Sequence, residues 1–169
     1  MPDRLIGPYC RERQVPKVIA AFIVAPGKVL MSPTRIFLAD DSAALLAELC
    51  HELEEEFEIV GTATNGQDAV DAVLRLAPDV IVLDISMPLL NGIEASLLIR
   101  EGQPRAKVLF LTIHESDEYI SAAFSAGASG YVTKRKIASD LAYGIREVSQ
   151  GNLFVSPSLR RTLSDPEMR

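Results

Sequence analysis

The feature that most constrains the fold is the alternation of short apolar segments with longer amphipathic segments between residues 34 and 150. The segments Val80–Leu83 and Val108–Leu111 are apolar throughout and do not alternate with polar residues. Continuous apolar runs of this length are typical of strands buried on both faces, as in a parallel sheet covered by helices. The pattern therefore predicts repeated strand–helix units.

Five strand–helix units can be assigned in this region, and right-handed crossovers between them predict a doubly wound, five-stranded parallel sheet of α/β class. The predicted strands are Arg35–Ala39, Ile59–Ala63, Val80–Leu83, Val108–Leu111 and Gly130–Val132. Ser42 and Ser116 are expected to cap the first and fourth helices. In the third helix, the residues expected to face the core are Ile93, Leu97 and Leu98.

The chain divides into three parts on composition. Residues 1–33 are rich in proline and lack a sustained period, so they are expected to be a disordered N-terminal extension. Because Met31 lies just before the first strand, a mis-assigned start is an alternative explanation of this extension. Residues 34–150 form the predicted domain, and residues 151–169 are expected to be a short C-terminal tail.

Composition argues against several classes of function. The formal net charge of −6 makes the chain a poor candidate for binding nucleic acid through its phosphates. No stretch reaches the roughly 20 apolar residues that a membrane-spanning helix needs. The two cysteines, Cys10 and Cys50, lack the spacing of a zinc site and fit a reducing compartment, so we expect a cytoplasmic protein.

Polar side chains follow four of the five predicted strands at the point where each strand ends. Asp40 and Asp41 follow the first strand, Asp84 the third, Thr112 the fourth and Lys134 the fifth. Because ligands of open α/β sheets bind outside the carboxyl ends of the strands, these residues are expected to converge on one site.

The chemistry of this set narrows its function. Crowded carboxylates repel one another, and Mg²⁺ relieves this while using only one or two of them as ligands. A remaining carboxylate can act as a nucleophile toward a phosphoryl group, whose oxygens Lys134 and Thr112 can stabilise. No glycine-rich phosphate loop is present, so the donor must bring an already activated phosphate rather than bound ATP.

Taken together, these residues resemble the receiver domain of two-component response regulators. The resemblance covers about residues 34–150 and includes the pairs Met87-Pro88, Asn91-Gly92 and Gly127-Ala128. It implies a flavodoxin-like (βα)5 fold with strand order 2-1-3-4-5.

The resemblance also implies a role for each site residue. Asp84 would accept the phosphoryl group, and Mg²⁺ would be held by Asp40, Asp41, Asp84 and the backbone carbonyl of Ser86. Lys134 would pair with a phosphoryl oxygen.

Further roles carried over from the family concern the conformational switch. Thr112 would bind the phosphoryl group and act as a switch together with Tyr131, which turns inward when Thr112 moves. His114, two residues after Thr112, and Ser86 would tune how fast water reaches the acyl phosphate.

Such a domain is not an enzyme acting on other molecules, since it promotes only its own phosphorylation and dephosphorylation. The implied donor is a sensor histidine kinase or a phosphotransfer protein. The implied output is an unidentified downstream protein that binds the face made by the fourth helix, fifth strand and fifth helix. A phosphorylation-linked homodimer is a further expectation.

One departure points to a subfamily. Arg135 follows the lysine where many receivers have proline, and Gly151–Pro157 (GNLFVSP) resembles the exit from receivers that carry a C-terminal helix-turn-helix. The sequence ends at Arg169, so we expect a stand-alone receiver or a truncated transcriptional regulator, with no direct nucleic-acid binding from this chain.

Two alternative hypotheses about function rest on the same residues. Haloacid-dehalogenase-type phosphohydrolases have two aspartates separated by one residue, whereas this chain has Ser86 in the second position and no cap domain. A receiver-like module that binds a partner without phosphorylation is the other rival, and the complete set of site residues argues against it.

Overall fold

The computed structural model describes residues 32–163, and its centre is a parallel sheet with the strand order β2-β1-β3-β4-β5-β6. Every neighbouring pair of strands is parallel. The strands are β1 (Arg35–Ala39), β2 (Glu58–Ala63), β3 (Val80–Leu83), β4 (Lys107–Thr112), β5 (Gly130–Thr133) and β6 (Phe154–Val155).

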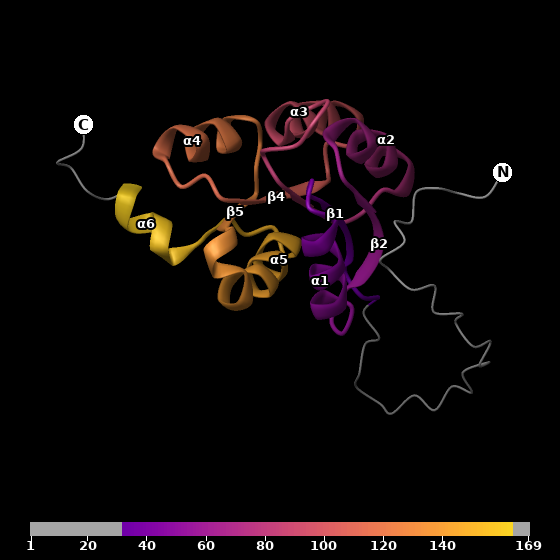
Figure 1. Ribbon diagram of the computed structural model, residues 1–169, viewed down its shortest axis with the longest axis horizontal. Helices are drawn as coiled ribbons and strands as arrows, with labels where there is room; N and C mark the ends of the chain where they lie inside the picture. The colour runs from indigo at the N-terminus through magenta and orange to yellow at the C-terminus, as the bar shows by residue number, and fades with distance from the viewer. Residues whose placement is uncertain (1–31, 164–169) are drawn as a thin grey trace.

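Helices cover both faces of this sheet, with α1 and α5 on one side and α2, α3 and α4 on the other (Figure 1). The helices are α1 (Ala43–Leu53), α2 (Gly66–Leu76), α3 (Gly92–Gly102), α4 (Asp117–Ser125), α5 (Ala142–Ser149) and α6 (Pro157–Leu163). A 3₁₀ turn, η1 (Lys134–Lys136), and a π-helical turn, η2 (Ile137–Leu141), connect β5 to α5. The α/β fold class and the parallel sheet predicted from the sequence are confirmed.

The core consists of two apolar clusters, one on each face of the sheet. Alternate residues of a strand enter opposite clusters, as Phe37 and Leu38 of β1 do. All four residues of β3 are buried. The continuous apolar runs therefore reflect strands that are covered on both sides.

The local signals at the helix starts agree with the structure only in part. Ser42 caps α1 by accepting a hydrogen bond from the backbone N–H of Leu45 at 3.3 Å. Ser116 is the N-cap residue of α4, as predicted, but its side chain makes no capping hydrogen bond.

The face that α3 presents to the core agrees with the prediction at Ile93, which packs against one of the core clusters, and differs at the two leucines. Leu97 and Leu98 are 47% and 42% exposed, and the helix instead buries Ala95, Ser96 and Ile99. The two leucines are therefore turned largely outward. Apolar spacing alone does not distinguish these two faces.

The expectation of five strands is corrected, because the sheet has a sixth strand within the region predicted to be a tail. Phe154 and Val155 pair in parallel with Gly130 and Tyr131 of β5. A two-residue strand is too short to give a periodic signal in the sequence. Its pairing covers the outer edge of β5, which would otherwise present unpaired backbone groups.

The predicted N-terminal extension falls almost entirely on residues 1–31, outside the described range. Among residues 32–163, no helix combines the length and apolar character needed to span a bilayer.

Candidate functional site

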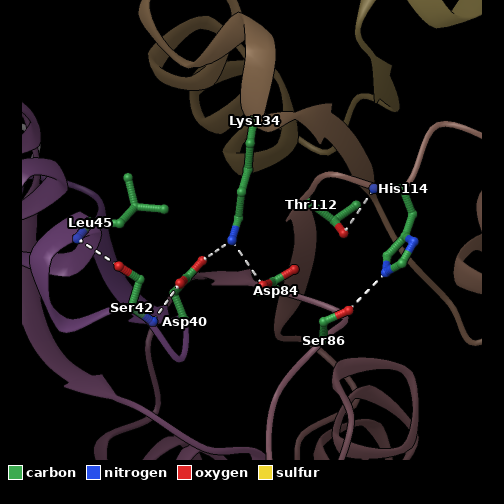
Figure 2. A network of polar contacts seen from close by, with 8 residues as sticks. All are labelled: Asp40, Ser42, Leu45, Asp84, Ser86, Thr112, His114 and Lys134. Carbon is green, nitrogen blue, oxygen red and sulfur yellow. Dashed lines mark hydrogen bonds and ion pairs between the residues drawn. The ribbon is translucent and has the colours of Figure 1, made fainter.

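The carboxyl ends of β1, β3, β4 and β5 bring together most of the residues singled out in the sequence. The backbone N–H of Asp84 donates a hydrogen bond to the carbonyl oxygen of Ala39 at 2.9 Å, which fixes the end of β3 beside the end of β1. Asp40, Asp84, Thr112 and Lys134 surround one point at this edge of the sheet (Figure 2).

Lys134 is the cation at the centre of this arrangement. Its Nζ lies 2.6 Å from Oδ2 of Asp40 and 2.9 Å from Oδ2 of Asp84. Burial disfavours the charged ammonium, but its hydrogen bonds and charge interactions with Asp40 and Asp84 outweigh this and raise the pKa of Lys134 above its ordinary value. Lys134 is therefore held charged between two buried carboxylates.

Asp40 is almost fully buried at the end of β1. Its Oδ1 accepts a hydrogen bond from the backbone N–H of Ser42 at 2.8 Å. Burial raises the pKa of Asp40 above its ordinary value, although the hydrogen bonds from Lys134 and Ser42 act in the opposite direction.

Asp40, Asp41 and Asp84 form an acidic cluster in which one oxygen from each residue lies within 4.8 Å of the others. Asp41 is exposed, whereas Asp84 is 3% exposed. Oδ1 of Asp84 is buried without a hydrogen-bond partner in the described part of the chain. Such an oxygen is costly to leave unsatisfied, and an all-oxygen donor set beside it fits a hard divalent cation such as Mg²⁺.

The start of α3 packs closely against the backbone of Asp84. The backbone N–H of Gly92 donates to the carbonyl oxygen of Ile85 at 2.8 Å. A Cβ at Gly92 would overlap the carbonyl oxygen of Asp84, so the helix approaches this backbone more closely than a side chain permits. Asn91 and Glu94 form a capping box that fixes the first turn of α3.

The loop between β4 and α4 forms the opposite wall. Oγ1 of Thr112 accepts a hydrogen bond from the backbone N–H of His114 at 3.3 Å. Nε2 of His114 lies 2.7 Å from Oγ of Ser86, and this contact joins the loop to the one after Asp84 (Figure 2). The His114 ring also stacks on Tyr119 of α4, with centroids 4.0 Å apart.

Tyr131 connects this loop to β5. Its side chain is fully buried, and its hydroxyl donates a hydrogen bond to the carbonyl oxygen of His114 at 2.8 Å. Burial, with a contribution from the charge of Asp84, raises the pKa of Tyr131. The side chain of Tyr131 thus points into the core and not toward solvent, which is the inward position.

The sequence analysis did not identify Thr133 and Glu115, whose contact helps to hold the loop between β4 and α4. Oγ1 of Thr133 donates to Oε1 of Glu115 at 2.6 Å, and Arg135 approaches the same oxygen at 3.7 Å. Thr133 immediately precedes Lys134, and Glu115 immediately follows His114. Their nearness to site residues was the only signal, and it says nothing about a contact between them.

Comparison with known proteins points to one family. The family model for the response regulator receiver domain matches residues 36–146. The transcriptional regulatory protein DegU of Brevibacillus brevis is 38% identical over 111 residues, which are 66% of this chain and 47% of that protein. The transcriptional regulatory protein DesR of Bacillus subtilis is 38% identical over 130 residues, or 76% of this chain and 64% of that protein.

A solved structure gives the same result. The crystal structure of a two-component response regulator of the LuxR family from Aurantimonas sp. SI85-9A1 superposes with a TM-score of 0.75 at 30% identity, over 82% of this chain and all of that one. The chain spans less than two thirds of the length of the two curated relatives named above. The fold, the arrangement of the site and these matches establish that the chain belongs to the receiver domain family of two-component response regulators.

Proposed function

We propose that this chain accepts a phosphoryl group on Asp84 from a sensor histidine kinase or a phosphotransfer protein. The proposal rests on the surroundings of the two oxygens of the Asp84 carboxylate. One oxygen contacts Lys134, and the other is buried without a hydrogen-bond partner among residues 32–163, inside a cluster of three carboxylates. A carboxylate in this setting has an oxygen available for bond formation and a cation positioned for the charge that arrives.

In the proposed step, a carboxylate oxygen of Asp84 attacks the phosphorus of a phosphohistidine. The new O–P bond forms as the N–P bond breaks, and the electron pair remains on the imidazole nitrogen, which takes up a proton from solvent. The ammonium of Lys134 and the hydroxyl of Thr112 donate hydrogen bonds to the transferred oxygens. For this, Lys134 exchanges a contact with a carboxylate for one with the phosphoryl group.

Asp40, Asp41, Asp84 and the backbone carbonyl of Ser86 would hold Mg²⁺. When bound, the ion neutralises charge on the carboxylates and on the phosphoryl oxygens. Of these residues, Asp41 is exposed and Asp40 is buried, so the proposed site would be open to solvent on the side of Asp41.

The proposed output is a change in the face formed by α4, β5 and α5. Thr112 would move toward the phosphoryl group, and the loop that carries His114 would move with it. Tyr131 is bonded to that loop, so its inward position would be favoured in the phosphorylated state. An unidentified downstream protein or a second copy of the chain would read this face, by a shift between two conformations.

The names of the relatives support a second, broader proposal, that this receiver serves transcriptional regulation. DegU and DesR are both transcriptional regulatory proteins, and this chain matches 47% and 64% of their lengths. We place the activity in the cytoplasm, where phosphohistidine donors charged from ATP are available. Under either proposal the chain is a phosphoacceptor and not an enzyme acting on other substrates.

The proposal is tested by intact-mass measurement after incubation with acetyl phosphate and Mg²⁺. Wild type should gain one phosphoryl group that is lost on standing, and EDTA should prevent the gain. Asp84→Asn should gain nothing. Steady release of phosphate from many small phosphate esters would instead support the phosphohydrolase alternative.

A further inference from the structure

A recess with a volume of about 200 Å³ lies on the face of the sheet that α3 and α4 cover (Figure 1). Its lining comes from α3, from the start of β4 and from the turn between α4 and β5. Lys107 begins β4 and Thr112 ends it, so the recess lies at the opposite end of the strands from Asp84. We name it the α3–α4 recess, and the lining residues with polar or charged side chains are Ser96, Arg100, Lys107 and Ser129.

The α3–α4 recess is basic, although the whole chain carries a formal net charge of −6. Arg100 and Lys107 line it, and no acidic residue within the described range 32–163 does so. Over the same range, neither cation makes a side-chain hydrogen bond or an ion pair with another residue. Because a concave surface lined by one sign of charge attracts ions of the other sign, the recess favours an anion.

The guanidinium of Arg100 is folded over the turn that follows α4. A Cβ added at Gly127 would overlap Nη1 of Arg100. The carbonyl groups of this turn do not require Arg100 as a cap, because that of Phe124 already accepts a hydrogen bond from the N–H of Gly127 at 3.0 Å. The carbonyl of Ala123 likewise accepts one from the N–H of Ala128. Capping of α4 therefore does not account for the position of Arg100.

Ser96 adds a hydroxyl group to the inner wall of the recess. Its side chain is 1% exposed, and Oγ is buried without a hydrogen-bond partner in the described part of the chain. Leaving a buried hydroxyl unpaired is unfavourable. An anion seated against this wall would accept the missing hydrogen bond.

We propose that the α3–α4 recess binds a small oxyanion of the phosphate class. Arg100 and Lys107 supply positive charge and N–H donors, and Ser96 supplies a hydroxyl donor. Drug-sized ligands occupy pockets of about 300–1,000 Å³, so a recess of about 200 Å³ fits an inorganic ion or a very small phosphate compound. The proposal does not depend on the phosphoacceptor function, because the two sites share no residue.

The test is a titration of the full chain with inorganic phosphate, followed through amide chemical shifts by nuclear magnetic resonance. EDTA keeps metal ions out of the acidic cluster, and sodium chloride holds the ionic strength constant. Saturable shifts are expected at the amides of Ser96, Gly127 and Ser129, with none at Asp84. Shifts that do not saturate, or that centre on residues outside the recess, would overturn the proposal.

A second titration, with glycerol phosphate, identifies the source of the phosphate group. Weaker binding than that of inorganic phosphate would assign the recess to the free ion, as its small volume favours. Tighter binding would assign it to the phosphate group of a larger molecule. Both results support an oxyanion site, whereas binding of neither compound would exclude one.

Three charge-removing variants test the two cations. Arg100→Gln and Lys107→Gln should each weaken phosphate binding by about ten-fold, a size expected for loss of a hydrogen bond to a charged group. Arg105→Gln is the control, because it removes the same charge from an exposed neighbour that does not line the recess. Its affinity should stay close to that of wild type. Equal losses in all three variants would indicate general charge attraction and would overturn the site.

Ser96→Ala separates a role in binding from a role in folding. The change removes a hydroxyl that has no partner within residues 32–163, so the midpoint of thermal unfolding without phosphate should not fall. Phosphate should raise the midpoint of wild type, since a ligand of the folded state stabilises it, and should raise that of Ser96→Ala less. A lower midpoint without phosphate, together with an unchanged rise on its addition, would remove Ser96 from the proposed site.

Discussion

The ammonium of Lys134 lies 2.9 Å from a carboxylate oxygen of Asp84, a residue 50 positions earlier in the chain. The same ammonium lies 2.6 Å from Asp40. One cation thus offsets the repulsion between two buried carboxylates.

Replacing Lys134 with methionine should destabilise the fold. Asp40 and Asp84 would then face each other without their cation, and removing one partner of a largely buried ion pair costs about 3 kcal/mol. Thermal unfolding should show a lower midpoint, and added Mg²⁺ should restore part of the loss. The control is Lys136→Met, which removes an exposed lysine of the same turn and should leave the midpoint nearly unchanged.

Replacing Asp40 with asparagine should weaken Mg²⁺ binding and remove the loss of stability that accompanies ionisation of Asp40. Because the pKa of Asp40 is raised in the folded state, folding favours its protonated form. Its ionisation therefore lowers stability as pH rises from below 3.8 through the folded pKa. Asparagine stays neutral and should avoid this loss.

The pH dependence separates this explanation from a general packing effect. The stability difference between Asp40→Asn and wild type should vanish near the acid end, where Asp40 is protonated in both folded and unfolded chains. A difference that is constant with pH would contradict the electrostatic explanation.

Asp41→Asn should weaken Mg²⁺ binding with little change in stability, since Asp41 is exposed.

Replacing Ser86 with alanine should open the site. Ser86 and His114 join the two loops beside Asp84 through a 2.7 Å contact, and without it water and small donors should reach Asp84 more easily. Both phosphorylation by acetyl phosphate and loss of the phosphoryl group should become several-fold faster, measured by the time course of intact mass. Unchanged rates in both directions would show that the contact does not restrict access.

Replacing Gly92 with alanine should destabilise the chain by about 2 to 3 kcal/mol, because the added Cβ would overlap the backbone of Asp84. Gly102, at the other end of α3, is the matched control. An added Cβ there meets only a side-chain methyl of Leu74, which is 41% exposed and can move aside. Chemical denaturation should therefore show a larger loss in the free energy of unfolding for Gly92→Ala than for Gly102→Ala. Equal losses in the two variants would contradict the close approach inferred at Gly92.

The sequence predicted the features that depend on long apolar runs and on strand ends. Asp40, Asp84, Thr112 and Lys134 converge because each follows a buried parallel strand, and parallel topology places those ends together. The bounds of β1 and β3 match their predicted ranges.

Features that depend on three-dimensional packing were not predictable in this way. Leu97 and Leu98 of α3 follow Ile93 at the spacing of one helix face and are nevertheless turned largely to solvent. The strand at Phe154 owes its existence to a partner in β5, and two residues carry no period of their own. The contact between Ser86 and His114 joins loops 28 residues apart, and no local pattern encodes it.

The central claim is that Asp84 itself receives the phosphoryl group, and its location can be measured directly. After reaction with acetyl phosphate and Mg²⁺, borohydride reduction converts an aspartyl phosphate to homoserine, and peptide mapping then identifies the modified residue. Homoserine is expected at position 84, and none when the acetyl phosphate is omitted. Modification at another residue, or none in a chain that binds Mg²⁺, would contradict it.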